Sequence, residues 1–121
     1  NGGLESPQDC LEALESCGGA MVGRAAYSHP LRWAAMDDLV FGTPPRGGRA
    51  SVVVPGLLPH AAAHLSRGGR IWDLCRHLVQ LVEGVRGARH WRRELGDRAQ
   101  RPGADLTVLE EAGRQLREAG L

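Results

Sequence analysis

The chain has 121 residues, of which 42% are hydrophobic and 24% are charged. This is the balance of a folded soluble protein rather than a disordered one, and no apolar run approaches the ~20 residues that a membrane-spanning helix needs. The three cysteines are an odd number without C-x-x-C spacing, so we expect neither a disulfide scaffold nor a zinc ribbon. There is no charged and then apolar leader, and we expect a cytoplasmic protein.

The charge is distributed unevenly along the chain. The net charge is only +1, but residues 60–102 contain nine arginines against four acidic residues, whereas the segments before and after have an acidic excess. All 15 basic residues are arginine, so each cationic contact can be planar and forked. A basic middle segment between acidic ends predicts an anionic partner that binds locally.

The first 24 residues have the pattern of a loop, a helix and a short strand. The Ser-Pro-Gln-Asp sequence at residues 6–9 predicts a helix start, because serine can cap the first turn and an acidic residue favours its positive end. A glycine pair at residues 18–19 ends this helix, and the apolar run at residues 20–22 predicts a buried strand. One such unit cannot form a parallel sheet alone, so we expect residues 1–42 to be the end of a larger α/β domain.

A stretch rich in proline and glycine follows. Residues 31–41 predict a second helical piece, and residues 43–49 predict a linker. Pro55 and Gly56 interrupt the next segment, which predicts a short element there and a helix from about Pro59 to Arg67.

The rest of the chain is helical by pattern. Apolar residues recur at helical spacing between residues 71 and 82, and a further helix is expected over residues 87–99. The last helix begins near Asp105 or Thr107, where Thr107 and Glu110 have the form of a capping box. Helices joined by short connections predict an antiparallel bundle.

Two glycine-containing sites are candidates for one phosphate cradle. Asn1, Gly2 and Gly3 precede the first helix, and Gly23 and Arg24 follow the predicted strand. In a barrel of alternating strands and helices, such loops lie side by side and commonly bind a phosphate. Glycine lets backbone N–H groups approach the phosphate, and arginine adds a charged fork. The alternative is that these glycines form ordinary turns.

Arginines gather on one side of the helix predicted over residues 87–99. At about 100° per residue, Arg89, Arg92 and Arg93 fall in one sector, to which Arg86 extrapolates, away from the apolar side of the helix. Such a ridge suits contacts with phosphates and base edges of folded nucleic acid. A solvated face, partly neutralised by acidic residues of the same helix, is the alternative.

The remaining reactive residue types predict no further site. His60 and His64 have a spacing compatible with metal binding, but no third ligand is near in the sequence, and we expect no metal. Cys75 falls on an apolar helix face and is expected to be structural. No nucleophile with a neighbouring base and no general acid/base set is visible.

Several segments resemble the tRNA-dihydrouridine synthases. Residues 1–3 and 19–27 (Gly-Ala-Met-Val-Gly-Arg-Ala-Ala-Tyr) are similar to the end of the flavin-binding barrel of that family. Residues 83–93 (Glu-Gly-Val-Arg-Gly-Ala-Arg-His-Trp-Arg-Arg) and 103–110 resemble the C-terminal helical domain of its A subfamily. The resemblance extends over nearly the whole chain, and the Gly-Ala-Arg-x-Trp-Arg-Arg block is its most specific part.

The resemblance implies a fold of class α/β plus all-α. Residues 1–42 would be the C-terminal remnant of a TIM (β/α)8 barrel that binds FMN. Residues 43–49 would be a linker, and residues 50–121 an antiparallel helical bundle that binds tRNA. We expect a monomer that binds neither a membrane nor a metal.

The function implied is the reduction of uridine to dihydrouridine in the D-loop of tRNA, at positions 20 and 20a, with FMN that NADPH recharges. Asn1, Gly2 and Gly3 match the family loop that contacts FMN, and Gly23 and Arg24 match its second loop, at the FMN phosphate.

Arg89 and Arg92 match family positions that contact tRNA, and Arg86 and Arg93 are candidates beside them. No residue of the chain matches the family's catalytic cysteine or the lysine and histidine that hold the flavin. We therefore expect the 121-residue chain to be inactive by itself. Two alternatives stay open: a tRNA-binding helical module without catalysis, and a fragment of another FMN barrel oxidoreductase that acts on a small molecule.

Overall fold

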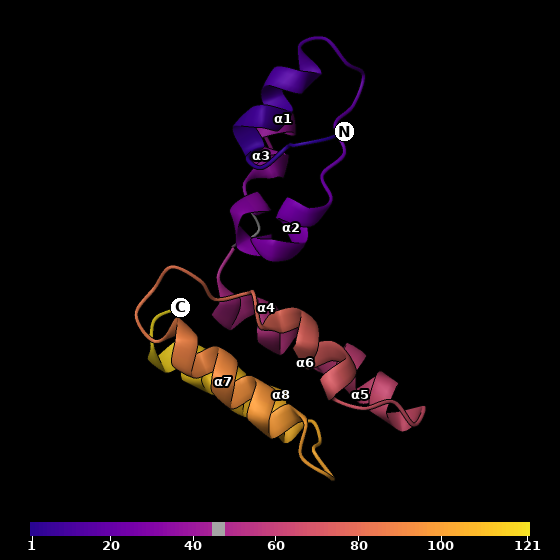
Figure 1. Ribbon diagram of the computed structural model, residues 1–121, viewed down its shortest axis with the longest axis vertical. Coiled ribbons are helices and arrows are strands. Elements are labelled where there is room, and N and C mark those ends of the chain that lie inside the picture. Colours follow the sequence, from indigo (N-terminus) through magenta and orange to yellow (C-terminus); the bar gives the residue numbers. More distant parts are fainter. Residues whose placement is uncertain (45–47) are drawn as a thin grey trace. The chain divides into compact units, whose positions relative to one another are not determined.

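A computed structural model describes residues 1–44 and 48–121 (Figure 1). The chain divides into two compact units, an N-terminal unit of residues 1–48 and a C-terminal unit of residues 49–121. Three residues of the predicted linker, 45–47, lie outside the described residues. Among the described helices, none is long and apolar enough to cross a membrane.

Short helices make up the N-terminal unit. The first begins where the sequence predicts, because Ser6 and Asp9 form a reciprocal cap: the Ser6 hydroxyl accepts from the Asp9 amide (3.2 Å), and the Asp9 carboxylate accepts from the Ser6 amide (2.9 Å). These amide hydrogen bonds, led by the one from Glu5, lower the pKa of Asp9. The elements are α1 (Pro7–Leu14), α2 (Arg24–Ser28), η1 (Pro30–Trp33, a 3-10 helix) and α3 (Met36–Phe41).

The prediction of a strand at residues 20–22 is wrong, and with it the α/β class and the TIM-barrel remnant. The described residues are helical or irregular, without a strand, and Met21 is 55% exposed. A strand satisfies its backbone groups by pairing with a neighbouring strand, and an isolated extended segment has no such partner. The apolar run therefore stays irregular.

The second helical piece also differs from the prediction. The segment 31–41 is split between η1 and α3, and α3 ends at Gly42, whose φ of +66° suits glycine. The sequence did not predict α2, which follows Gly23 directly. Phe41 is 78% exposed, and Cys10 is the one fully buried hydrophobic residue of this unit among the described residues.

The C-terminal unit is a helical assembly with a continuous apolar core. Its elements are α4 (Ala50–Gly56), α5 (Leu58–Ser66), α6 (Trp72–Leu78), α7 (Ala88–Ala99) and α8 (Thr107–Glu118). In Figure 1, α7 and α8 run side by side as an antiparallel pair, and α4 packs against α8. The largest buried side chains include Val54, Ile71, Leu109 and Leu116.

Several helix ends in this unit differ from the predictions. Pro55 lies inside α4 instead of breaking it, and α6 ends at Leu78. Leu81 and Val82 are nevertheless buried, because the turns after α6 keep their side chains in the core. No capping box forms at α8; instead the Asp105 carboxylate accepts hydrogen bonds from the amide and the hydroxyl of Thr107.

Two helical glycines should respond oppositely to substitution. A Cβ at Gly113 would lie 3.2 Å from Cγ of Pro55, where α8 packs on α4, whereas a Cβ at Gly96 would meet nothing closer than 4.0 Å. We expect Gly113→Leu to destabilise the chain by ~1–3 kcal/mol through overpacking, and Gly96→Ala to stabilise it by ~1 kcal/mol through helix propensity. Urea unfolding would measure both, and a stable Gly113→Leu variant would contradict this packing.

Stability should fall in acid partly because of Glu111. Hydrogen bonds from Arg114 (2.6 and 2.8 Å) and then from Gln115 lower the pKa of Glu111 from its usual 4.5 to about 2. Since this pKa is depressed in the folded state, its stabilising contribution is complete above the unfolded value and is lost as the pH falls from 4.5 toward 2. We expect the Glu111→Gln variant to show a smaller drop in Tm between pH 5 and 2. The exposed neighbour supplies the control, because Glu110→Gln should keep the full drop.

Candidate phosphate pocket and arginine face

The N-terminal unit contains a pocket of about 310 Å³. Its walls come from the loop before α1, from one face of α2 and from η1. The pocket residues are Gly3, Leu4, Glu5, Arg24, Ala25, Ser28, His29 and Arg32.

Local backbone geometry forms these walls. Gly2 and Gly3 have φ values of +94° and +73°, which residues other than glycine rarely adopt. These two residues turn the chain toward the start of α1. Arg24 is the first residue of α2, and Pro30 opens η1 directly after it. This turn returns Arg32 to the loop, where its Nη1 donates to the Glu5 carbonyl (3.2 Å).

The structure brings together some of the predicted cradle residues. Gly3 and Arg24 line the same pocket, although they are 21 positions apart in the sequence. Asn1, Gly2 and Gly23 are next to them in the chain but do not line the pocket. Sequence reasoning missed Ser28, His29 and Arg32, because the pocket depends on the turn between α2 and η1, which no spacing rule predicted.

The residue types of the pocket suit a small anion. Two guanidinium groups offer forked N–H donors, which match the oxygens of a phosphate. Ser28 adds a hydroxyl, and Gly3 leaves room for an approaching group, since a Cβ there would meet nothing within 4 Å. The residues present therefore fit the phosphate end of a cofactor.

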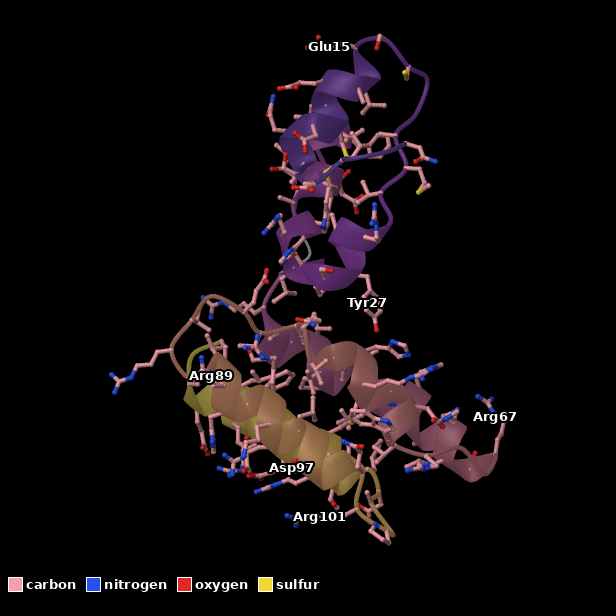
Figure 2. All side chains as sticks on the ribbon, viewed as in Figure 1. Glu15, Tyr27, Arg67, Arg89, Asp97 and Arg101 are labelled. Carbon is pink, nitrogen blue, oxygen red and sulfur yellow. The ribbon has the colours of Figure 1, made fainter. Side chains whose placement is uncertain are left out.

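The second candidate site is the outward side of α7, which we call the arginine face: Arg86, Arg89, Arg92 and Arg93. Arg89 and Arg93 are exposed, Arg92 is half-buried, and Arg86 is exposed in the segment before the helix. Figure 2 shows Arg89 near the start of α7 and Asp97 near its end. The opposite side of the helix is buried through Ala88, Trp91, Leu95 and Ala99.

Ion pairs within α7 distinguish these arginines from one another. Glu94 pairs with Arg98 (3.3 Å), and Asp97 lies 3.8 Å from Arg93. Among the described residues, no carboxylate lies within ion-pair distance of Arg89 or Arg92. The acidic residues of the helix therefore neutralise its C-terminal half and leave the positive charge at the other half.

His64 takes a structural role. His64 Nε2 lies 2.8 Å from Oδ2 of Asp73, which also accepts the Arg70 amide (2.9 Å), and these bonds lower the pKa of Asp73. The pair joins α5 to the start of α6. Within residues 1–44 and 48–121, no three histidine, cysteine or acidic side chains gather as a metal site would require.

Comparison with known proteins assigns the family. The family model described as dihydrouridine synthase (Dus) matches residues 1–117. The chain belongs to the dihydrouridine synthase family. The resemblance predicted from the sequence is thus confirmed.

Three relatives in this family have the same name. Proteins named "tRNA-dihydrouridine(20/20a) synthase" are 39% identical in Salmonella typhimurium, 38% in Escherichia coli K12 and 35% in Vibrio cholerae, each over 112 residues and 93% of this chain. The aligned parts make up 34%, 32% and 34% of those proteins, so the chain spans about a third of their length.

The cysteines of this family member do not line the pocket. Cys10 and Cys75 are buried, and Cys17 is exposed. Burial raises the pKa of the Cys75 thiol to about 11, which disfavours its reactive thiolate.

The three thiols should therefore react at different rates. We expect Ellman's reagent at pH 8 to modify Cys17 rapidly in the native chain, and Cys10 and Cys75 only as the chain opens, because the reagent needs an accessible thiolate. Absorbance at 412 nm would follow the reaction with and without denaturant. Cys17→Ser should abolish the fast phase, and a fast phase of three thiols would contradict the burial described.

Proposed function

We propose that this chain is part of a flavin-dependent oxidoreductase that reduces uridine to dihydrouridine in the D-loop of tRNA, at positions 20 and 20a. The observation that carries the proposal is the family match over residues 1–117, together with the name shared by its relatives. The chain spans about a third of those relatives, and we assign to it contacts with FMN and with tRNA.

The pocket of the N-terminal unit is the proposed site for the FMN phosphate. Arg24 would bind the phosphate through its guanidinium group, and Asn1, Gly2, Gly3 and Gly23 would offer backbone N–H groups nearby. FMN that NADPH has reduced supplies the hydride in this chemistry. The part of this chain is to anchor the cofactor through its phosphate.

The arginine face is the proposed site for tRNA. Arg89 and Arg92 have no acidic partner within ion-pair distance among the described residues, so their charge is available to phosphates. Arg86 and Arg93 extend the same face at its edges. Because a base must leave its stack to react, the enzyme has to hold the surrounding RNA firmly, and phosphate contacts from a rigid helix do this.

Exposed apolar side chains on the N-terminal unit also favour the proposal that this chain is part of a longer protein. Met21, Tyr27 and Phe41 are 55%, 56% and 78% exposed, and Tyr27 projects outward from α2 in Figure 2. A contact with a further part of the protein would remove this apolar surface from water. We propose that the whole protein acts as a monomer in the cytoplasm, where tRNA is found, and uses neither a metal nor a membrane.

A second candidate function is a tRNA-binding module without catalysis. The observation that favours it is the C-terminal unit, which has its own apolar core and bears the arginine face. An FMN enzyme that acts on a small molecule would leave the unpaired arginines of α7 without a role.

The tRNA assignment can be tested by substitution. We expect Arg89→Ala and Arg92→Ala each to weaken tRNA binding by ~1–3 kcal/mol and to reduce its salt dependence, because each removes a phosphate contact and the release of its counterions. Filter binding over a series of KCl concentrations would measure both effects. Arg114→Ala is the matched control, since the Arg114 guanidinium is bonded to Glu111 and Glu118 within α8.

The outcomes separate the candidate functions. Unchanged affinity in both α7 variants would contradict the two functions that involve tRNA and favour an enzyme for a small molecule. Loss of tRNA affinity without any binding of FMN by the full-length protein would favour the module without catalysis. Because Arg92 is half-buried, thermal unfolding of its variant would separate lost contacts from lost packing.

A further inference from the structure

We propose that Arg32 is a second phosphate-binding residue of the pocket in the N-terminal unit, where it acts together with Arg24 on the phosphomonoester of FMN. This inference rests on the proposed function, because it assigns a further residue to the same FMN site.

The position of Arg32 is set by contacts on both sides of the pocket. It belongs to η1, yet its Nη1 donates to the carbonyl of Glu5 (3.2 Å), in the loop that continues from Gly3. This bond holds the guanidinium against the wall opposite to its own backbone. Arginine has five N–H donors, and this hydrogen bond uses one of them. The remaining donors are available to a ligand in the pocket that Arg32 lines.

The charges around the pocket favour a doubly charged anion. Arg24 and Arg32 line it together with a single carboxylate, that of Glu5. Among the described residues, neither arginine lies within ion-pair distance of this or any other carboxylate. The two guanidinium groups therefore keep their full charge toward the pocket. A phosphomonoester has a charge of about −1.5 to −2 at pH 7, which two guanidinium groups match better than one.

The same comparison distinguishes FMN from RNA as the source of the phosphate. A backbone phosphodiester has a single negative charge, whereas the terminal phosphate of FMN has nearly two and three free oxygens. The pocket offers two forked cations and the Ser28 hydroxyl, a donor set for several oxygens of one group. The terminal phosphate of FMN is the ligand that uses this set fully.

Binding of FMN and riboflavin, which lacks the phosphate, tests the assignment. Flavin fluorescence titrations would compare the full-length protein that contains this chain with its Arg32→Ala, Arg32→Gln and Arg24→Ala variants. We expect the Arg32 variants to bind FMN about tenfold more weakly and riboflavin unchanged, because a charge-assisted phosphate contact is lost. Arg32→Gln keeps a donor for the Glu5 carbonyl and so removes the charge with little effect on the local fold. Thermal unfolding would verify that each variant is folded.

The possible outcomes test the role of Arg32 separately from the proposed function. If Arg24→Ala weakens FMN binding and both Arg32 variants bind it like wild type, Arg32 is not part of the site and the proposed function stands. An equal loss for riboflavin, or a loss of tRNA affinity instead of FMN affinity, would also overturn the role of Arg32. If the full-length wild-type protein prefers FMN no more than riboflavin, the proposed FMN contact fails, and this inference with it.

Discussion

The buried stripe of α7 is the constraint on which the candidate tRNA surface depends. Trp91 is 6% exposed and Leu95 is 3% exposed, and both pack in the core of the C-terminal unit. In a helix with 3.6 residues per turn, burying these two side chains directs Arg89 toward solvent and leaves Arg92 at the boundary. The buried indole of Trp91 therefore determines where the guanidinium groups lie, although the indole itself is not exposed to a ligand.

Pairing of charges within the helix then refines this surface. A pair at i and i+4 contributes only a few tenths of a kcal/mol (about 0.3–0.5) to an exposed helix, so the pairs Glu94–Arg98 and Arg93–Asp97 are minor for stability. These pairs matter more for the electrostatic potential around α7 than for stability. They neutralise the helix toward its C-terminal end and leave Arg89 and Arg92 as its unbalanced charge. Position along α7, rather than the number of arginines, thus distinguishes a binding surface from a solvated one.

Sequence reasoning succeeded where local physics decides the structure. The start of α1 depends on a reciprocal cap between Ser6 and Asp9, three residues apart, and the extent of α7 depends on one apolar stripe. The family was also predicted from the sequence, because the segment 83–93 is a specific block.

Prediction from the sequence failed where the local structure depends on residues far away in the chain, or on two side chains that compete for the same backbone group. The apolar run at residues 20–22 has the composition of a strand, but a strand needs a pairing partner, which the described residues do not supply. Asp105 replaced the predicted capping box at α8, since a carboxylate two residues before Thr107 reaches its amide first. Arg32 was missed for a similar reason: its place in the pocket results from the turn at Pro30 and a bond to Glu5, 27 positions earlier.

The two units differ in how their structure is maintained, and this affects what each site can do. The C-terminal unit buries a connected set of apolar side chains, so the arginine face lies on a preformed scaffold. The N-terminal unit has little buried apolar area, and caps, turns and single hydrogen bonds such as that from Arg32 to Glu5 order it instead. Regions with few buried contacts open with a small free-energy cost. A ligand that binds only the closed pocket would then stabilise the unit by an amount that grows with the logarithm of its concentration above Kd. Ligand binding at the candidate pocket would thus be coupled to the order of the unit, whereas binding at the arginine face would not.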